Sequence, residues 1–486
     1  MIRLPIRHLL CAALAAQLTG CTVGPDYVRP VETAAPAYKE AGDWKTATPS
    51  DQFTRGAWWK IYNDAELDRL EAAATDANQE LAAAAARYRE AQTLVDQARA
   101  GLFPTVGVGA SATRGGNGSG ASNANSLNGL GGASVRNSFS ASVDASWEVD
   151  LWGRVRRAVE ASEANAAAGA ADLESARLSI QGQLAIAYFS LRVVDSAQRL
   201  LDRTVDAYQQ TLTLTTNRYN AGVVARADVV QADVQLKSAQ AQAVDNRATR
   251  AQFEHAIAVL TGQAPASFSL AVADDLPVPP DIPPGLPSQL LERRPDVAAA
   301  ERRMAAANAQ IGVATAAFFP TLSLSASGGF ASSKLAQLLS LPNRFWSIGA
   351  NLAGPLFDAG LRRAQRDQTL AQYDEAVANY RQTVLAGFQE VEDNLATLAV
   401  LKDEATIQQA AVDAARLSVD LTTNQYKAGI VGFINVVAAQ AVLFNNERSL
   451  VQLRGRQWQA NVTLVRALGG GWSTADGAPA GLTPRG

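Results

Sequence analysis

The chain contains very few of the residues that build metal sites and nucleophilic catalytic sites. Its 486 residues include two cysteines, two histidines and two methionines, and one of each lies within residues 1–20. If those residues are a leader that is removed, His255 and Met304 are the single histidine and methionine of the mature chain. A Cys/His zinc site and an internal disulfide are then excluded. A Ser–His–Asp set would depend on His255, which lies in a helical pattern where we expect a packing or surface role. The sequence therefore predicts no enzyme, no metal and no cofactor.

The chain also lacks a strong charge of one sign and a membrane-spanning helix. Lysine and arginine number 43 against 46 acidic residues, so the formal net charge is −3, and removal of two leader arginines makes it −5. This mild negative charge argues against nucleic acid as a partner. No segment after the leader has the ~20 consecutive apolar residues of a transmembrane helix. A membrane could then be crossed only by a closed β-barrel, because lipid satisfies no backbone hydrogen bonds.

Residues 1–20 have the pattern of a lipoprotein signal peptide. Arg3 and Arg7 give a basic start, the apolar stretch Leu9–Ala16 follows, and Leu-Thr-Gly precedes Cys21. We expect lipidation of Cys21, because several acyl chains on one residue anchor a protein stably, at ~0.8 kcal/mol per buried methylene. Thr22 stands where an inner-membrane retention signal usually has aspartate, which favours the outer membrane. The alternative is an ordinary signal peptide with a chance cysteine.

The rest of the chain consists of two copies of one unit. Residues 215–236 and 422–443 are identical at eleven of 22 positions, at an offset of 207. The same offset relates Gly153 to Gly360, and each glycine separates an alternating pattern from a long helical one. Upstream, the tripeptide Phe-Pro-Thr recurs at an offset of 216. The extra residues of the first copy therefore fall in the Gly/Asn/Ser-rich stretch 115–132, which is typical of a flexible loop between strands.

Each copy has the same order of parts: a helix, a β-hairpin, a very long helix, a tight turn and a further helix. The predicted segments before the repeats are a signal peptide at 1–20 and a lipidated extended segment at 21–56. Repeat 1 spans 57–262 (one first helix from about Ala57 to Gly101, hairpin 103–149, long helix 154–218, second helix 225–262), and a Pro-rich linker follows at 263–287. Repeat 2 spans 288–470 (hairpin 319–356, long helix 361–427, second helix 433–468), and a disordered tail follows at 471–486.

The hairpin segments alternate between apolar and polar residues with a period of two. Within residues 138–149, Phe139 and Val143 fall on one face, and Ser140 and Asp144 fall on the other. Strands of ~10 residues with this alternation and with aromatic residues near their ends are typical of membrane barrels, although a half-buried soluble hairpin is the alternative. Four strands cannot close a barrel, because the smallest barrels have about eight. Several protomers must then share one barrel, and three would supply twelve strands.

The two long helices have a coiled-coil pattern. The stretches between Gly153 and Gly222 and between Gly360 and Gly429 contain no proline. Each would form a rod of ~100 Å at 1.5 Å per residue. Apolar residues recur at alternating spacings of three and four, and abundant alanine allows close packing. We expect these helices to form the wall of a tube rather than a free-standing stalk, because each grows out of a hairpin.

Several segments resemble the outer-membrane factor family, the TolC/OprM-like exit ducts, in the lipoprotein branch that serves resistance–nodulation–division (NodT-type) efflux systems. These segments are Cys21–Pro30, Trp58–Asp64, Leu290–Val297, Ala307–Gly312, Ala317–Pro320 and Pro355–Gly360. The resemblance implies an α+β membrane protein that forms a homotrimer, with a twelve-stranded barrel in outer-membrane lipid and a twelve-helix periplasmic tube. It also implies a periplasmic adaptor and an inner-membrane pump of the resistance–nodulation–division class as partners.

The resemblance implies roles for the turns at the ends of the long helices. The first turn contains Tyr219 and Gly222 and the second contains Tyr426 and Gly429, and glycine there fits a left-handed helix end. The second turn would line the periplasmic gate, with Ile434 at an apolar constriction.

Asn435 and Ala438 stand where the family often has acidic residues, so an acidic ring at the gate is not expected. In the first copy, Arg226 and Asp228 are candidates for contact with an adaptor or a neighbouring protomer. Alternatively, Asp228 only complements the helix dipole.

The segment Arg293-Arg294-Pro295-Asp296 is characteristic of the family, and we expect it to be structural. Pro295 suits a first helical turn, and Asp296 beside it complements the helix dipole. The sequence does not name a transported substrate, although the scarcity of soft ligands argues against a dedicated copper or silver duct.

The preferred interpretation is a passive exit duct for small molecules in a tripartite efflux pump. The alternatives are an outer-membrane duct for type I protein secretion and, in a different class, a structural envelope lipoprotein that conducts nothing.

Overall fold

A computed structural model of the chain describes residues 22–29, 37–39, 57–117, 134–273, 277–282 and 294–470. The predicted signal peptide, Cys21, Arg293, most of the 115–132 loop, much of the linker and the predicted tail lie outside these residues. The chain divides into two compact units. Unit one comprises Met1–Pro30, Arg89–Ala167 and Glu301–Asn379, and unit two comprises Val31–Tyr88, Ala168–Ala300 and Tyr380–Gly486. Each unit contains parts of both repeats, so the repeats are not the compact units.

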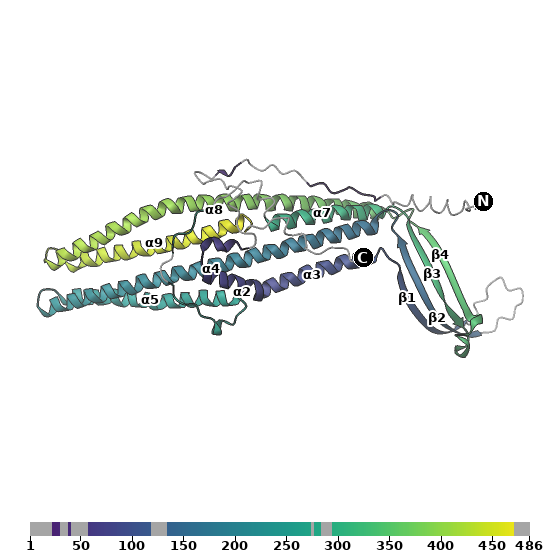
Figure 1. Ribbon diagram of the computed structural model, residues 1–486, viewed down its shortest axis with the longest axis horizontal. Coiled ribbons are helices and arrows are strands. Elements are labelled where there is room, and N and C mark those ends of the chain that lie inside the picture. The colour runs from purple at the N-terminus through teal and green to yellow at the C-terminus, as the bar shows by residue number, and fades with distance from the viewer. Residues whose placement is uncertain are drawn as a thin grey trace, which may run out of the picture. The chain divides into compact units, whose positions relative to one another are not determined.

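Unit one contains a four-stranded antiparallel sheet. Its strands are β1 (Thr105–Asn117), β2 (Ser134–Val149), β3 (Thr321–Ser332) and β4 (Arg344–Ala353). They lie side by side in this order across the sheet (Figure 1). The hairpins of the two repeats meet where β2 pairs with β3. The two copies therefore share a single sheet, which explains why neither copy is compact by itself.

The four longest helices form two matched pairs. The described helices are α2 (Ala65–Ala77), α3 (Gln79–Ala100), α4 (Arg154–Asn220), α5 (Arg226–Leu260), α7 (Pro295–Ala316), α8 (Leu361–Lys427) and α9 (Phe433–Ala467), with short 3₁₀ turns at Trp58–Tyr62, Pro265–Ser267, Leu335–Gln337 and Leu341–Asn343. Helices α4 and α8 have 67 residues each, and α5 and α9 have 35 each. These equal lengths support the duplication. Figure 1 shows α5 returning along α4 and α9 returning along α8.

The first helix differs from the expectation of one continuous helix from about Ala57 to Gly101. Residues 58–62 form a 3₁₀ turn, and Asp64 then caps α2 by accepting hydrogen bonds from the backbone N–H groups of Glu66 and Leu67, both at 3.0 Å. Asn78 has an extended backbone that separates α2 from α3, and its side chain accepts a hydrogen bond from Leu81 N at 3.0 Å. The predicted single helix is therefore two helices, because Asp64 and Asn78 each cap the start of a new helix.

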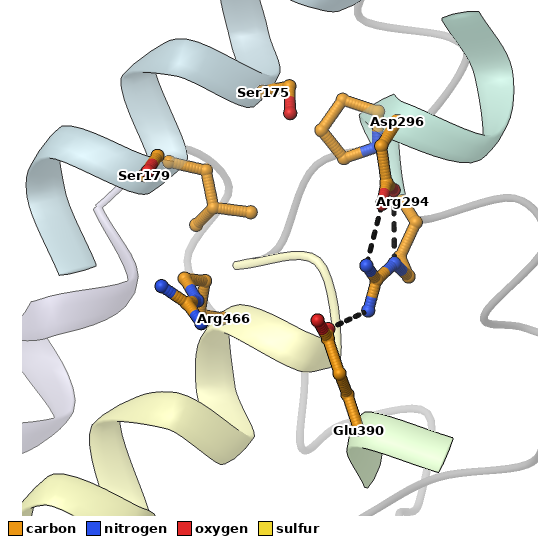
Figure 2. A pocket seen from close by; sticks show the side chains of 8 residues that line it. Ser175, Ser179, Arg294, Asp296, Glu390 and Arg466 are labelled. Carbon is orange, nitrogen blue, oxygen red and sulfur yellow. Dashed lines mark hydrogen bonds and ion pairs between the residues drawn. The ribbon is translucent and has the colours of Figure 1, made fainter. Parts of the chain in front are cut away.

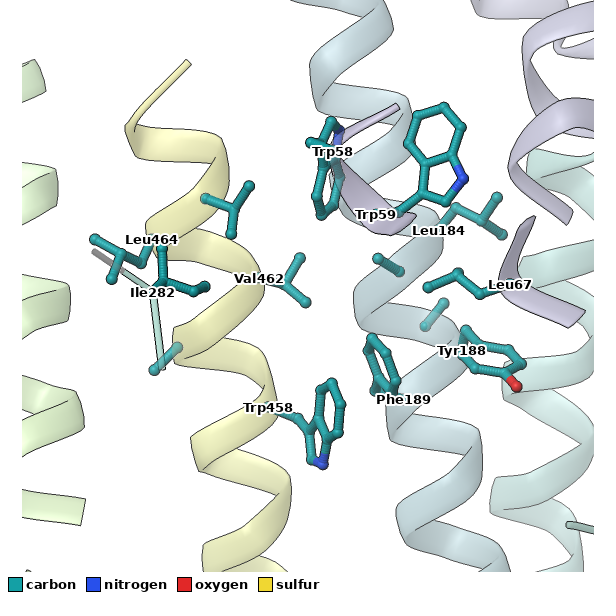
Figure 3. Close-up of a cluster of buried hydrophobic side chains, with 14 of the residues drawn as sticks. Trp58, Trp59, Leu67, Leu184, Tyr188, Phe189, Ile282, Trp458, Val462 and Leu464 are labelled. Carbon is teal, nitrogen blue, oxygen red and sulfur yellow. The ribbon is translucent and has the colours of Figure 1, made fainter. Parts of the chain in front are cut away.

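The main core lies in unit two and is rich in aromatic residues. Phe189 stacks on Trp458 with ring centroids 3.8 Å apart, and Tyr62 lies edge-on to Phe189 at 5.0 Å. Trp58 is almost completely buried, and its indole N–H donates to Gln181 at 3.2 Å. Figure 3 shows Trp458 and Phe189 facing each other from α9 and α4. This core holds helices of both repeats together.

Among the described residues, no helix combines the length and the apolar character that crossing a membrane requires.

Candidate functional site: a two-faced sheet, an N-terminal strap and two helical tips

The sheet has one apolar and one polar face, as the alternation predicted. Residues opposite each other on neighbouring strands share a face. One apolar row across the four strands consists of Val108, Val143, Gly328 and Trp346. The adjacent polar row consists of Gly107, Asp144, Ser327 and Ser347. On the apolar face, Trp346 is 77% exposed and Ile348 is 78% exposed. A contiguous exposed apolar surface of this kind marks contact with a membrane or a protein.

Aromatic side chains fix the end of the sheet from which the helices begin. The indole N–H of Trp147 donates to the carbonyl of Leu102 at 3.0 Å, and that of Trp152 donates to Pro320 at 2.8 Å. Trp152 also stacks on Phe319 with centroids 4.7 Å apart. An amphipathic ring with a satisfied N–H suits the interface between lipid and water.

Residues 22–29, here called the N-terminal strap, are held to the rest of unit one by polar contacts. The pairs are Val23 with Trp152, Pro25 with Asn308, Asp26 with Arg157 and Tyr27 with Glu301. Arg157, whose side chain is only 6% exposed, donates to Asp26 at 2.7 Å and to Glu160 at 2.8 Å. Burial and the hydrogen bond to Glu301 raise the pKa of the Tyr27 hydroxyl. The strap is therefore a specific part of the fold.

Close backbone contacts also hold the strap. Gly24 has φ +102°, and a Cβ atom there would lie 2.5 Å from Cα of Gly312 in α7. Gly153, between β2 and α4, has φ +80°, and a Cβ atom there would lie 2.8 Å from Cγ2 of Thr22. The first described residue after Cys21 therefore lies against the junction between strand and helix.

The turns that join the paired long helices have the same backbone. Gly222 has φ +72° and Gly429 has φ +76°, which are the left-handed conformations that the sequence predicted. In each turn, the N–H that follows the glycine donates to the carbonyl five residues earlier at 2.9 Å. This pattern satisfies carbonyls that the helix end would otherwise leave without partners.

The tyrosines of the two turns have different surroundings. Tyr219 is 41% exposed, whereas Tyr426 is 3% exposed. The guanidinium carbon of Arg218 lies 4.7 Å from the ring centroid of Tyr426, and Nη1 of Arg218 donates to the carbonyl of Lys427 at 3.1 Å. A cation over an aromatic face is favourable, so Arg218 connects the first tip to the second within the chain.

A small apolar cluster lies beside this contact. The Tyr426 ring is 5.5 Å from that of Phe433, and Val436, Val437 and Ala232 complete the buried part of the cluster. Since Ala232 belongs to α5 and the others belong to α8 and α9, the cluster also joins the two tips.

The other predicted gate residues lie on the opposite side of α9. Ile434 is 64% exposed, and Asn435 and Ala438 are exposed beside it. The structure therefore brings these three together and separates them from Tyr426. In the first tip, Arg226 is exposed, and the half-buried Asp228 lies in the first turn of α5.

The described part of the Arg-Arg-Pro-Asp segment forms an ion-pair network. Arg294 donates to Asp296 at 2.6 and 3.0 Å, to Glu390 at 2.7 Å and to the carbonyl of Ala467 at 3.2 Å. Burial by itself would lower the pKa of Arg294, but the bonds and charges of Asp296 and Glu390 raise it overall. Arg294, Asp296 and Glu390 line a cavity of about 140 Å³. Figure 2 shows how these three side chains point toward one another. Arg294 thus fastens the beginning of α7 to α8 and the end of α9.

Sequence reasoning did not single out Arg218 and Phe433. The sequence does distinguish them, because both positions differ between the two copies. At the offset of 207, Arg218 corresponds to Gln425, and Phe433 corresponds to Arg226. These two differences between otherwise matched tips account for the different surroundings of Tyr219 and Tyr426. Within the described ranges, no group of three or more His, Cys, Asp or Glu side chains is placed to hold a metal ion.

Comparisons with known proteins agree with this architecture. The family model described as "Outer membrane efflux protein" matches residues 72–263 and 286–470. The pyoverdine export outer membrane protein OpmQ of Pseudomonas aeruginosa is 33% identical over 428 residues, covering 86% of this chain and 88% of that protein. The toluene efflux pump outer membrane protein TtgF of Pseudomonas putida is 30% identical, covering 97% of this chain and 98% of that protein.

A solved structure of the outer-membrane channel OprN superimposes with a TM-score of 0.85 at 32% identity, and the match covers 93% of this chain and 100% of that one. The fold is TolC-like, with four antiparallel strands and long paired helices in each chain. The chain belongs to the outer membrane efflux protein family and is a non-enzymatic outer-membrane channel of an efflux pump.

Proposed function

We propose that three copies of the chain form a lipid-anchored passive duct, which a periplasmic adaptor connects to an inner-membrane pump. The observation that carries the proposal is the four-stranded sheet, in which β1 and β4 each pair with only one of the described strands. In hydrocarbon, each unpaired backbone group costs several kcal/mol. The free edges of β1 and β4 must therefore pair with other protomers, and three protomers give a closed barrel of twelve strands.

Exposed apolar residues on the long helices support association of protomers. On α8, Val400, Ile407 and Leu421 are exposed and lie seven or fourteen residues apart. On α5, Val230 and Val234 are exposed one helical turn apart. Heptad spacing is typical of a coiled-coil seam, so these faces suit helices of a neighbouring protomer.

The strap supports lipidation of Cys21. Thr22 is fixed against Gly153, at the base of the strands. Acyl chains on the preceding residue would enter the membrane leaflet close to the ends of these strands. The anchor would therefore help to set the depth of the sheet in the membrane.

The tips support a gated entrance. Ile434, Asn435 and Ala438 would face the lumen, while Tyr219 and Arg226 would meet an adaptor. Arg218 joins the two tips of one chain by its bond to the carbonyl of Lys427 and its contact with Tyr426. We propose that these contacts hold the tips closed. Opening would require these contacts to rearrange when the adaptor binds.

The relatives suggest the class of cargo. OpmQ is named for pyoverdine export and TtgF for toluene efflux. We propose that this chain likewise passes small organic molecules, which are selected by a pump of the resistance–nodulation–division class.

Affinity purification from crosslinked cells, followed by mass spectrometry, tests the assembly. Recovery of an adaptor with a proton-driven pump is the expected result. Recovery of an ATP-driven exporter would instead favour a protein-secretion duct, and recovery of neither would favour a structural lipoprotein. Labelling with radioactive palmitate tests the anchor: Cys21→Ser should lose the label, while the matched control Cys11→Ser should keep it.

A further inference from the structure

A single carboxylate stands without a cationic partner on the polar face of the described sheet. Asp144 lies near the middle of β2, and its Oδ2 accepts a hydrogen bond from the Ser142 hydroxyl at 2.8 Å. The charged residues of the described strands are Arg114, Arg136, Asp144, Glu148 and Arg344. Of the other four, two lie on the apolar face, one is a carboxylate paired with an arginine, and one is a cation.

Two of these charges belong to the apolar face, and one is already neutralised. Arg114 is opposite Asn137 and Arg344 is opposite Phe330, both in rows of the apolar face. Glu148 accepts two hydrogen bonds from Arg154, at 2.8 and 2.7 Å. The polar face therefore has one unneutralised carboxylate, Asp144, and one cation, Arg136.

The surroundings of Asp144 leave its charge open to the space over the sheet. Its neighbours in the same row are Gly107 and Ser327. In the next row, Gly109 has no side chain, and a Cβ atom there would come no nearer than 3.8 Å to Oδ2 of Asp144. Small neighbours neither cover the carboxylate nor supply a positive charge.

We propose that Asp144 determines the ion preference of the duct by forming a ring of fixed negative charge inside the barrel. The proposal rests on the proposed function, because only an oligomeric barrel places the polar face around a lumen. Fixed charge of one sign in a confined aqueous space concentrates ions of the opposite sign. The duct should therefore conduct cations in preference to anions.

The predicted gate residues of the second tip do not provide an equivalent charge. On the exposed side of α9, Ile434, Asn435 and Ala438 are uncharged, and the first ionisable residue of this helix is Glu447. Arg136 is eight residues from Asp144 along β2, about 27 Å at ~3.4 Å per residue. This separation exceeds the Debye length of ~10 Å at 0.1 M salt, so the two charges act nearly independently there.

The test is the reversal potential of purified channels in a planar bilayer under a KCl gradient. At about 0.1 M salt, where the Debye length is ~10 Å and Arg136 is screened from Asp144, Asp144→Asn should lower the K⁺/Cl⁻ permeability ratio by about twofold or more. The difference from wild type should shrink towards 1 M salt, where the Debye length is ~3 Å. Asparagine keeps the size of the side chain, so conductance serves as the control for assembly.

A relocated charge gives the matched variant. Ser327 lies directly opposite Asp144 on the same face, so Asp144→Asn combined with Ser327→Asp should restore the cation preference. A conducting Asp144→Asn channel with wild-type permeability ratios would overturn this inference and leave the duct intact. Anion preference in the wild type would overturn it too. A wild-type protein that does not conduct would refute the proposed function itself, and the inference with it.

Discussion

The contact between Gly24 and Gly312 makes a sharp prediction about the N-terminal strap. Alanine at position 24 would place its Cβ 2.5 Å from Cα of Gly312 and 3.2 Å from its backbone nitrogen. Gly312 cannot easily retreat, because a Cβ atom on its own Cα would already lie 2.8 Å from Cγ of the buried Arg157. We therefore expect Gly24→Ala to weaken the attachment of the strap to α7.

The magnitude follows from two costs. A left-handed backbone costs an alanine roughly 1–2 kcal/mol, and overpacking costs roughly 1–3 kcal/mol. The total of about 2–5 kcal/mol is comparable with the strap's contacts, since a charge-assisted hydrogen bond contributes about 1.5–3 kcal/mol. Even 2 kcal/mol raises the population of the detached strap about 30-fold, because 1.4 kcal/mol is a factor of ten.

Hydrogen–deuterium exchange of the detergent-purified protein measures this opening directly. The amide of Val23, which is bonded to the carbonyl of Trp152, should exchange faster in Gly24→Ala, while β1–β4 exchange as before. Gly222→Ala is the matched control, because its φ is +72° but nothing lies within 4 Å of the added Cβ. Strap exchange as slow in Gly24→Ala as in wild type would refute the reasoning.

Three further substitutions test the core and the tips. Burial raises the pKa of the Glu71 carboxyl well above its usual range in the folded protein. The free energy of unfolding should therefore fall as pH rises past the unfolded pKa of about 4.3, because the unfolded chain then loses this proton more readily than the folded one. Glu71→Gln should raise Tm at pH 7 but not at pH 4. Arg218→Gln removes the cation over Tyr426, a contact of about 0.5–2 kcal/mol, and should raise channel open probability in bilayer recordings; an unchanged value would show that Arg218 does not hold the tips. Arg294→Ala should lower the free energy of unfolding by about 2–4 kcal/mol. This is less than the full value of a buried ion pair, because the Glu390 side chain is 45% exposed. The variant should have a lower Tm and an unchanged single-channel conductance.

Much of the fold could be predicted from the sequence because two simple periods dominate it. The period-two alternation in residues 138–149 fixed which side chains share a face, and the strand register agrees with it. The duplication predicted equal helix lengths, and α4 and α8 each have 67 residues. The helix-ending roles of Gly222 and Gly429 were also predictable, because few other residues adopt the left-handed conformation readily.

Other features depend on contacts between distant parts of the chain, which a local pattern does not contain. The break at Asn78 depends partly on its bond to the carbonyl of Leu260, 182 residues away in the sequence. The division into compact units depends on the pairing of β2 with β3 from different repeats. The strap's partners Arg157 and Glu301 also belong to different repeats, so its attachment was not apparent from residues 22–29.

The tips show how the duplication kept one backbone and produced two surfaces. Phe433 gives Tyr426 an aromatic neighbour at 5.5 Å, whereas the corresponding residue in the first copy is the exposed Arg226. A charged side chain at that position cannot bury a tyrosine ring without desolvation, so Tyr219 is left 41% exposed. Arg218 strengthens the asymmetry, because it is present only in the first copy but contacts the tyrosine of the second. The tyrosine of the second tip is therefore held by contacts within the chain. The first tip exposes an aromatic and a basic side chain, so a partner that bound them would not have to break the cluster around Tyr426.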